Sequence, residues 1–175
     1  MEKIVHKIKW FWAWQDDQEE AWLRAMSQRG YHLVSVRPFG SYSFNLGAST
    51  DYVYRLDYQT SRKDMKNYLQ LFRDAGWEHI GEMSGWQYFR KEAMPGESPE
   101  IYTDVESKVA KYKRLIGYVG FIDILMIVVF SSRILQHYPY PWWNAVQVVF
   151  GVVVLLLTYG TIRLALRIRQ LRRLF

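Results

Sequence analysis

Residues 22–34 read WLRAMSQRGYHLV, and residues 68–80 read YLQLFRDAGWEHI. The two stretches align at an offset of 46 residues, so that an aromatic-leucine pair, a large apolar residue, a glycine, a second aromatic residue and a branched apolar residue coincide. Further on, Phe44 matches Phe89 at an offset of 45, after the deletion of one residue. The sequence therefore predicts an internal duplication within the first 92 residues.

Each copy has the pattern of a strand, a helix and two further strands. Alternating apolar residues predict the strands, and helix-starting acids and helix-ending glycines delimit the helices. In the first copy we expect a strand over 4–12, a helix from Asp16 or Asp17 to Gly30, and strands over 31–37 and 41–46. In the second copy we expect a strand over 51–58, a helix opening at 61–64 and ending at Gly76, and strands over 77–82 and 85–91. The expected fold is α+β, with duplicated β-α-β-β units forming one antiparallel sheet that carries two helices on one face.

The last third of the chain predicts a two-helix transmembrane hairpin. Between Arg114 and Arg133 the only charged residue is Asp123, and residues 142–162 carry no charge, so each run is long enough to cross a bilayer. Basic residues flank the outer ends of both runs, which predicts a two-pass protein of the cell membrane with both termini cytoplasmic. The alternative is two buried helices of a soluble protein. The net charge of +6 comes from this third, so its basic residues indicate membrane flanks and no direct nucleic-acid contact.

The chain lacks a signal-peptide pattern, so we expect residues 1–92 to form a cytoplasmic domain. Residues 93–102 contain two prolines and a glycine and predict a linker. Residues 103–106 (TDVE) form a capping box, which predicts a helix that starts at Asp104 and continues into the membrane. Residues 103–175 would thus comprise a juxtamembrane helix, the hairpin and a basic tail.

A heptad seam runs along the expected junction helix. Apolar residues recur with alternating spacings of four and three, and one acid, Asp123, interrupts them. A carboxyl group inside the hydrocarbon is costly and needs a protein partner. One hypothesis is a homodimer through the seam; the alternative is that the seam packs on the second span. The seam comprises Val105, Val109, Tyr112, Ile116, Val119, Asp123, Met126 and Phe130.

Aromatic-rich motifs run through the first two thirds of the chain: WFWAW at 10–14, EAWL at 20–23, GYHL at 30–33, YVYRLDY at 52–58, GWE at 76–78, WQYFRK at 86–91 and IYTD at 101–104. In this order they resemble domain-of-unknown-function family 2812 over about the first 115 residues. The resemblance implies a bacterial, membrane-anchored protein, often encoded beside a PadR-type transcription regulator, and it supplies no catalytic residues. Separately, the doubled strand-helix-strand-strand order is similar to effector-binding domains of the GyrI type, which hold hydrophobic drugs between the two copies.

The sequence shows no catalytic signature. There is no cysteine, no phosphate-binding glycine loop, and no pair of histidines at metal-ligand spacing. His32 and His79 are one residue out of register between the copies, which argues against a paired site. The acids at 16–20 open a helix, where a structural role is expected. We therefore expect no enzyme activity, no metal and no cofactor.

The aromatic residues are in surplus over what one sheet face can bury. Trp10, Trp12 and Trp14 would share one face of the first strand, and Tyr52, Tyr54 and Tyr58 one face of its repeat equivalent. These six are the candidate residues for binding a ligand or partner, and an oversized aromatic core is the alternative. The expected function is a membrane-anchored, non-enzymatic sensory or interaction domain for signalling that binds a hydrophobic ligand or a PadR-type regulator. The alternative function is an accessory structural subunit of a membrane complex.

Overall fold

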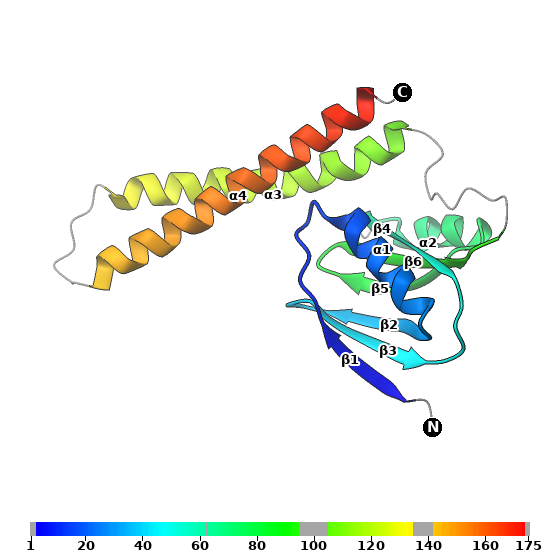
Figure 1. Ribbon diagram of the computed structural model, residues 1–175. Coiled ribbons are helices and arrows are strands. Elements are labelled where there is room, and N and C mark those ends of the chain that lie inside the picture. Colours follow the sequence, from blue (N-terminus) through cyan, green and yellow to red (C-terminus); the bar gives the residue numbers. More distant parts are fainter. Residues whose placement is uncertain (1–2, 62, 95–104, 135–141, 174–175) are drawn as a thin grey trace. The chain divides into compact units, whose positions relative to one another are not determined.

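The computed structural model describes residues 3–61, 63–94, 105–134 and 142–173. The chain divides into two compact units, Met1–Thr103 and Asp104–Phe175 (Figure 1). Most of the expected linker and the expected helix start at Asp104 lie outside the described residues.

The first unit contains the predicted duplication. Both copies have the order strand, helix, strand, strand, which confirms the α+β class. The first copy consists of β1 (Ile4–Ile8), α1 (Asp16–Ser27), β2 (Tyr31–Arg37) and β3 (Ser41–Leu46). The second consists of β4 (Tyr52–Tyr58), α2 (Met65–Asp74), β5 (Glu78–Met83) and β6 (Trp86–Glu92).

Backbone details repeat between the copies as well. Gly30 and Gly76, 46 residues apart, end their helices at φ values of 80° and 81°. At the hairpin turns, Phe39 and Ser84 both have positive φ and are each followed by a glycine. The strand register also shifts at equivalent places, between Leu33 and Ser35 and between His79 and Gly81. The duplication therefore extends to the turns and bulges.

The strands form two sheets where the sequence suggested one. Their orders are β1-β3-β2 and β4-β6-β5, both antiparallel, and β2 lies beside β5 without joining it in a ladder. A bulge bends a strand and interrupts its pairing. Because β2 and β5 both carry a bulge, the two facing edges do not continue as a single sheet.

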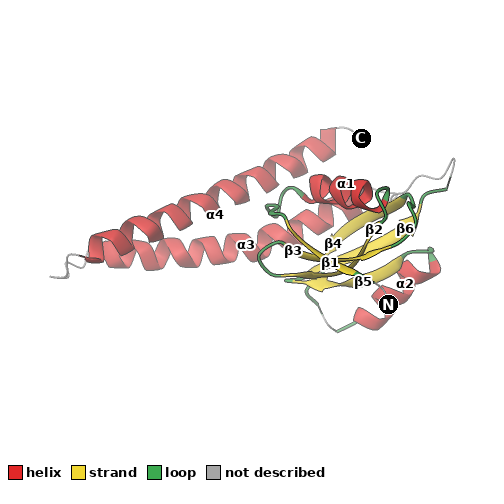
Figure 2. Cartoon of the chain, turned by 60° about the horizontal axis from the view of Figure 1, so that its bottom comes forward, coloured by secondary structure: helices red, strands yellow, loops and turns green. Residues whose placement is uncertain are grey.

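The helices also differ from the expected placement on a common face. Phe89 packs against Phe72 of α2, with ring centroids 4.5 Å apart, whereas the next residue back, Tyr88, bonds to Glu19 of α1. Neighbouring strand residues point to opposite faces, so the sheet of the second copy has α2 on one face and α1 on the other. Figure 2 shows α1 and α2 on opposite sides of the strands.

The first strand is shorter than predicted, ending at Ile8. Its partner strand β3 begins at Ser41, which pairs with Ile8, so residues 9–12 have no ladder partner on that side. After Ile8 the Lys9 N–H donates to the Gly40 carbonyl oxygen at the hairpin turn, and the chain then leaves the sheet. The predicted strand position of Trp10 and Trp12 is therefore wrong.

The second unit is a pair of antiparallel helices, α3 (Val105–Ile134) and α4 (Trp142–Arg173). α3 is unbroken from Val105 onward, as predicted. Two segments, Lys108–Ser132 and Trp142–Arg172, are long and apolar enough to cross a membrane. Large apolar side chains such as Phe121 and Leu155, each 70% exposed, point outward from the pair.

Candidate functional site: a cleft between the two copies

A cleft of about 450 Å³ lies where β2 approaches β5. Equivalent positions of the two copies line it: His32 corresponds to Glu78, and Asn45 corresponds to Arg90. Tyr52, the first residue of β4, completes this polar set. The cleft is thus a product of the duplication, and its volume suits a small molecule.

Arg90 is held in place by several contacts. Its Nε and Nη2 donate to Oε2 and Oε1 of Glu78 over 2.7 and 2.9 Å, a bidentate pair. Its Nη1 donates to the Leu33 carbonyl oxygen of the first copy over 3.4 Å. The guanidinium also lies 4.9 Å from the centre of the Tyr52 ring. Arg90 therefore bridges the two copies in the lining of the cleft.

His32, a lining residue of the cleft, has an unused acceptor. Its Nε2 lies 2.9 Å from the Ala48 carbonyl oxygen, which assigns the proton to Nε2 and leaves Nδ1 as an acceptor in the neutral ring. Nδ1 is buried and has no hydrogen-bond partner among the described residues. A Cβ on Gly47 would lie 2.9 Å from His32 Cδ2, so glycine at 47 makes room for this ring. An unpaired buried acceptor of this kind favours a ligand that donates a hydrogen bond.

Tyr52 lies between the two basic groups. Its ring makes an edge contact with His32 at 5.4 Å on one side and the Arg90 contact on the other. Tyr52 belongs to the predicted aromatic set and is the member that the structure places in the cleft. His32, Glu78 and Arg90 were not proposed from the sequence as a site, because the bulges that bring β2 beside β5 have no clear sequence signal.

His79 is out of register with His32, as expected from the alignment. It occupies the position of Leu33 in the first copy, and its Nε2 lies 2.9 Å from the Gln87 side-chain oxygen. Its ring also contacts Phe89, on the face of the sheet that α2 covers. His79 borders the cleft, but its Nε2 bonds to Gln87 and not to His32.

The other predicted tyrosines belong to the core. Tyr54 and Tyr58 are 1% and 2% exposed, although they share a strand face with Tyr52 as predicted. The Leu33 N–H donates to the Tyr54 hydroxyl over 3.4 Å, and Tyr58 makes an edge contact with Trp86. For these two residues the structure shows the oversized aromatic core that the sequence left as an alternative.

The three tryptophans form a ladder of their own after β1. Trp12 stacks on Trp14 at 5.2 Å with an interplanar angle of 4°, and Trp10 makes an edge contact with Trp12 at 5.8 Å. Trp10 and Trp12 remain exposed. Because Tyr54 and Tyr58 are buried, the tryptophans and tyrosines do not form one common exposed surface.

The acids that open α1 connect the helix to both sheets. Glu19 is buried, and its Oε1 accepts hydrogen bonds from the hydroxyls of Tyr42 and Tyr88, each over 2.8 Å. Burial raises the pKa of Glu19 above its ordinary value, although both hydroxyls oppose the shift. Glu20 accepts the Leu56 N–H and forms an ion pair with Arg55, which caps the free edge of β4. The role of Glu19 and Glu20 is thus structural, but it consists of contacts with the sheets, and no side-chain hydrogen bond caps the helix at Gln15.

Asp123 finds a partner within the hairpin. The Thr158 hydroxyl of α4 lies 3.1 and 3.0 Å from the two carboxylate oxygens, and Asp123 is 6% exposed. Seven residues further along α3, the Phe130 ring stacks on the Phe150 ring of α4, with centroids 5.9 Å apart. The α3 seam therefore faces α4, which is the intrachain alternative. In the sequence, Thr158 follows a run of valines and leucines, and its hydroxyl is the one feature there that indicates this contact.

No curated protein and no solved structure matches the chain. One family model does, and its match covers residues 15–124, from the residue before α1 through the rest of the first copy and all of the second into α3. The match spans well over half of the chain and includes all the cleft residues and Asp123. The chain therefore belongs to the family described as "Protein of unknown function (DUF2812)".

Proposed function

We propose that the protein is a membrane-anchored, non-enzymatic sensor domain that binds a small polar ligand in the cleft between its two copies. The observation that carries the proposal is the buried, unpaired Nδ1 of His32 at the wall of a cleft of about 450 Å³. Leaving a buried polar group without a partner costs about 1–3 kcal/mol, which a ligand donor would recover on binding.

The chemistry of the cleft defines the class of ligand. A molecule with an N–H or O–H group suits His32 Nδ1, and a flat group suits the exposed part of the Tyr52 ring. A polar ligand takes the place of the hydrophobic ligand expected from the sequence, because Tyr54 and Tyr58, which would have contacted a hydrophobic ligand, lie in the core.

A non-enzymatic role is supported by the pairing of the charged groups. Glu78 and Arg90 neutralise each other through two short hydrogen bonds. A carboxylate tied to a guanidinium is a weak general base, so the cleft is better suited to recognition than to proton transfer.

The hairpin supports an anchoring role. The outward apolar faces of α3 and α4 would contact lipid, and basic residues lie at the ends that connect to the first unit and to the C-terminus. By the positive-inside rule, both ends are cytoplasmic, so the ligand would be sensed in the cytoplasm.

Native mass spectrometry of the full chain, purified in a mild detergent from its own cells, tests the proposal. We expect a retained small-molecule mass that disappears in the His32→Ala and Tyr52→Ala variants. The control is His6→Ala, since His6 bonds to Ser43 on an exposed strand outside the cleft. A retained mass that survives both cleft variants would contradict the site. A stoichiometric protein mass in its place would favour the regulator-binding hypothesis.

A further inference from the structure

We propose that one end of the first copy docks on the anionic surface of the membrane that α3 and α4 enter. The docking surface, called here the end patch, consists of Ile8, Trp10, Trp12 and Phe39, which are 83%, 57%, 42% and 84% exposed. The proposal rests on the membrane anchoring above and is independent of the ligand cleft.

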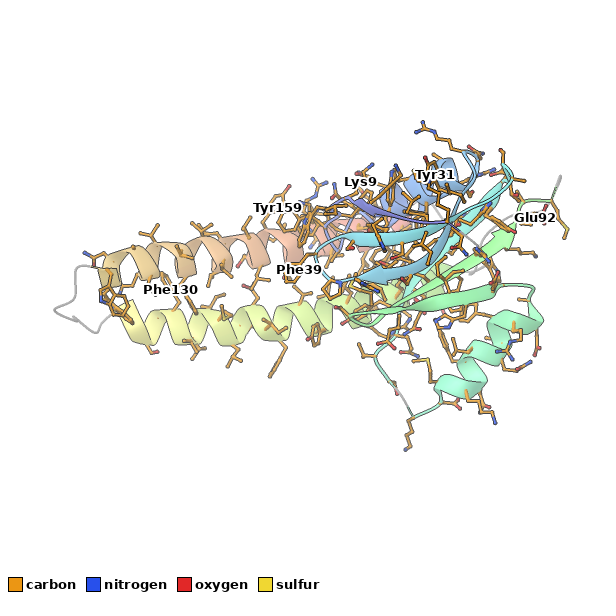
Figure 3. All side chains as sticks on the ribbon, turned by 90° about the horizontal axis from the view of Figure 1, so that it is seen from below. Lys9, Tyr31, Phe39, Glu92, Phe130 and Tyr159 are labelled. Carbon is orange, nitrogen blue, oxygen red and sulfur yellow. The ribbon has the colours of Figure 1, made fainter. Side chains whose placement is uncertain are left out.

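The residues of the end patch come from adjoining segments of the chain. Ile8 pairs with Ser41, and the Lys9 N–H donates to the Gly40 carbonyl oxygen over 2.8 Å, so residues 8–10 run alongside the β2–β3 turn. The edge contact between Trp10 and Trp12 extends the surface further. Figure 3 shows Lys9 and Phe39 at the end of the domain opposite Glu92.

Phe39 is an unusual residue for its position. Its φ is 64°, in the left-handed region that bulky side chains rarely adopt, and the equivalent turn of the second copy has Ser84. The fold therefore accepts a small polar residue here, and the first copy instead presents an exposed aromatic ring. Folding stability gives no reason for that ring, whereas a partner that buries it does.

The charge of the strands also differs between the two copies, and it favours the first copy as the one that binds an anionic surface. The strands of the first sheet carry Lys7 and Arg37 and no acidic residue, and Lys9 follows β1 directly. The strands of the second sheet carry four acidic residues, Asp57, Glu78, Glu82 and Glu92, against three basic ones, so their net charge is negative where that of the first sheet is positive. Basic residues beside exposed aromatic and aliphatic side chains are the combination that binds an anionic lipid surface.

Protection of an edge strand explains only part of this pattern. β1 is an edge strand, and lysines at an edge discourage pairing with another chain. The exposed Ile8 and Phe39 would have the opposite effect in water. Tryptophan, by contrast, is enriched at membrane interfaces, where its ring lies among the headgroups.

The short connection to α3 also keeps the domain close to the bilayer. Ten residues separate Met94 from Val105 at the start of α3. At full extension eleven Cα steps reach roughly 40 Å, so the domain is confined to a thin layer beside the membrane. That confinement raises the effective concentration of the end patch at the lipid surface.

Site-directed spin labelling of the full chain in lipid nanodiscs tests the proposal, and the absence of cysteine permits single labels. The reporter is Ile8→Cys, which leaves all three aromatic residues of the end patch in place. The matched control is Ser84→Cys, at the equivalent turn of the second copy. Val128→Cys, on the outward face of α3, checks anchoring separately. Collision rates with a water-soluble nickel complex and with oxygen are measured with and without phosphatidylglycerol in phosphatidylcholine discs.

We expect phosphatidylglycerol to lower the nickel collision rate at the Ile8→Cys label roughly fivefold and to leave the Ser84→Cys label unchanged. Adding Phe39→Ser, which copies the turn of the second copy, should restore exposure of the Ile8→Cys label to water. Equal nickel rates at both labels in anionic discs would overturn the proposal, provided that the Val128→Cys label reports hydrocarbon. A low nickel collision rate at the Ile8→Cys label in both lipids, together with spin–spin broadening of its spectrum, would overturn the proposal in favour of contact with a second copy of the chain.

Discussion

The hydroxyl of Tyr88 donates to the buried carboxylate of Glu19 over 2.8 Å, across 69 residues of sequence. This contact bonds a helix of the first copy to the central strand of the second. Since β2 and β5 share no ladder, side chains of α1 supply much of the connection between the copies.

Glu19 makes the stability of the domain depend on pH. Its pKa is raised by burial, so the folded state binds a proton more tightly than the unfolded state. The resulting stabilisation is complete below the ordinary pKa of a glutamate and is lost as pH rises through the raised value. We expect the melting temperature to fall over that range. In Glu19→Gln, which keeps the acceptor oxygen, the fall should be smaller. Circular dichroism melts across the acid to neutral range check this, and parallel curves for both proteins would contradict it.

The contact between Asp123 and Thr158 predicts a selective effect in the hairpin. Thr158→Val removes a donor from a buried carboxyl group and should destabilise the helix pair by about 0.6–1.7 kcal/mol. Thr161→Val is the control, because the Thr161 hydroxyl bonds to the Leu157 carbonyl within α4. Unfolding in mixed detergents measures both.

The same contact bears on the dimer hypothesis. If Thr158 of the same chain satisfies Asp123, then Asp123→Leu leaves any self-association in a membrane two-hybrid assay unchanged. A clear loss of signal would show that Asp123 also contacts a second chain.

The predictable part of the fold is local. Helix and strand order, the duplication and the long apolar helices follow from periodicity, glycine positions and run length, which are properties of neighbouring residues. Strand alternation also predicts that Tyr52, Tyr54 and Tyr58 share one face. Which face was buried depended on α1 packing over β4, a contact between copies that local pattern does not record.

The cleft illustrates the same limit. Its walls are His32 and Glu78, which look unrelated in sequence and become neighbours only because two bulged strands lie side by side. Similarly, Trp10 and Trp12 continue the alternation of β1, but the strand ends where its partner ends. The end of a strand that is set by the end of its partner depends on tertiary structure, so the local sequence does not predict it.

Glycine at 151 sets the spacing of the hairpin near its far end. A Cβ there would lie 3.3 Å from the Phe130 ring, so Gly151→Ala should push the helices apart locally and Gly151→Val should do so more strongly. Gly117→Ala is the control, since among the described residues nothing lies within 4 Å of its Cβ position. We expect Gly117→Ala to be neutral or slightly stabilising and Gly151→Val to lower resistance to detergent unfolding. Equal tolerance at both sites would show that α3 and α4 do not pack in this register.

Gly47 provides a test of the cleft that leaves its polar groups chemically intact. A Cβ at 47 would lie 2.9 and 3.0 Å from Cδ2 and Nε2 of His32, so Gly47→Ala must displace that ring and lengthen its bond to the Ala48 carbonyl oxygen. The displacement should move the imidazole nitrogen resonances of His32 in NMR spectra and abolish retention of the bound small molecule. Gly81→Ala, on β5 with open space at its Cβ, should alter neither. Because Gly47→Ala removes no donor or acceptor, loss of the ligand in this variant would mean that the position of the His32 ring governs binding. Retention of the ligand despite shifted His32 resonances would instead place the ligand elsewhere in the domain.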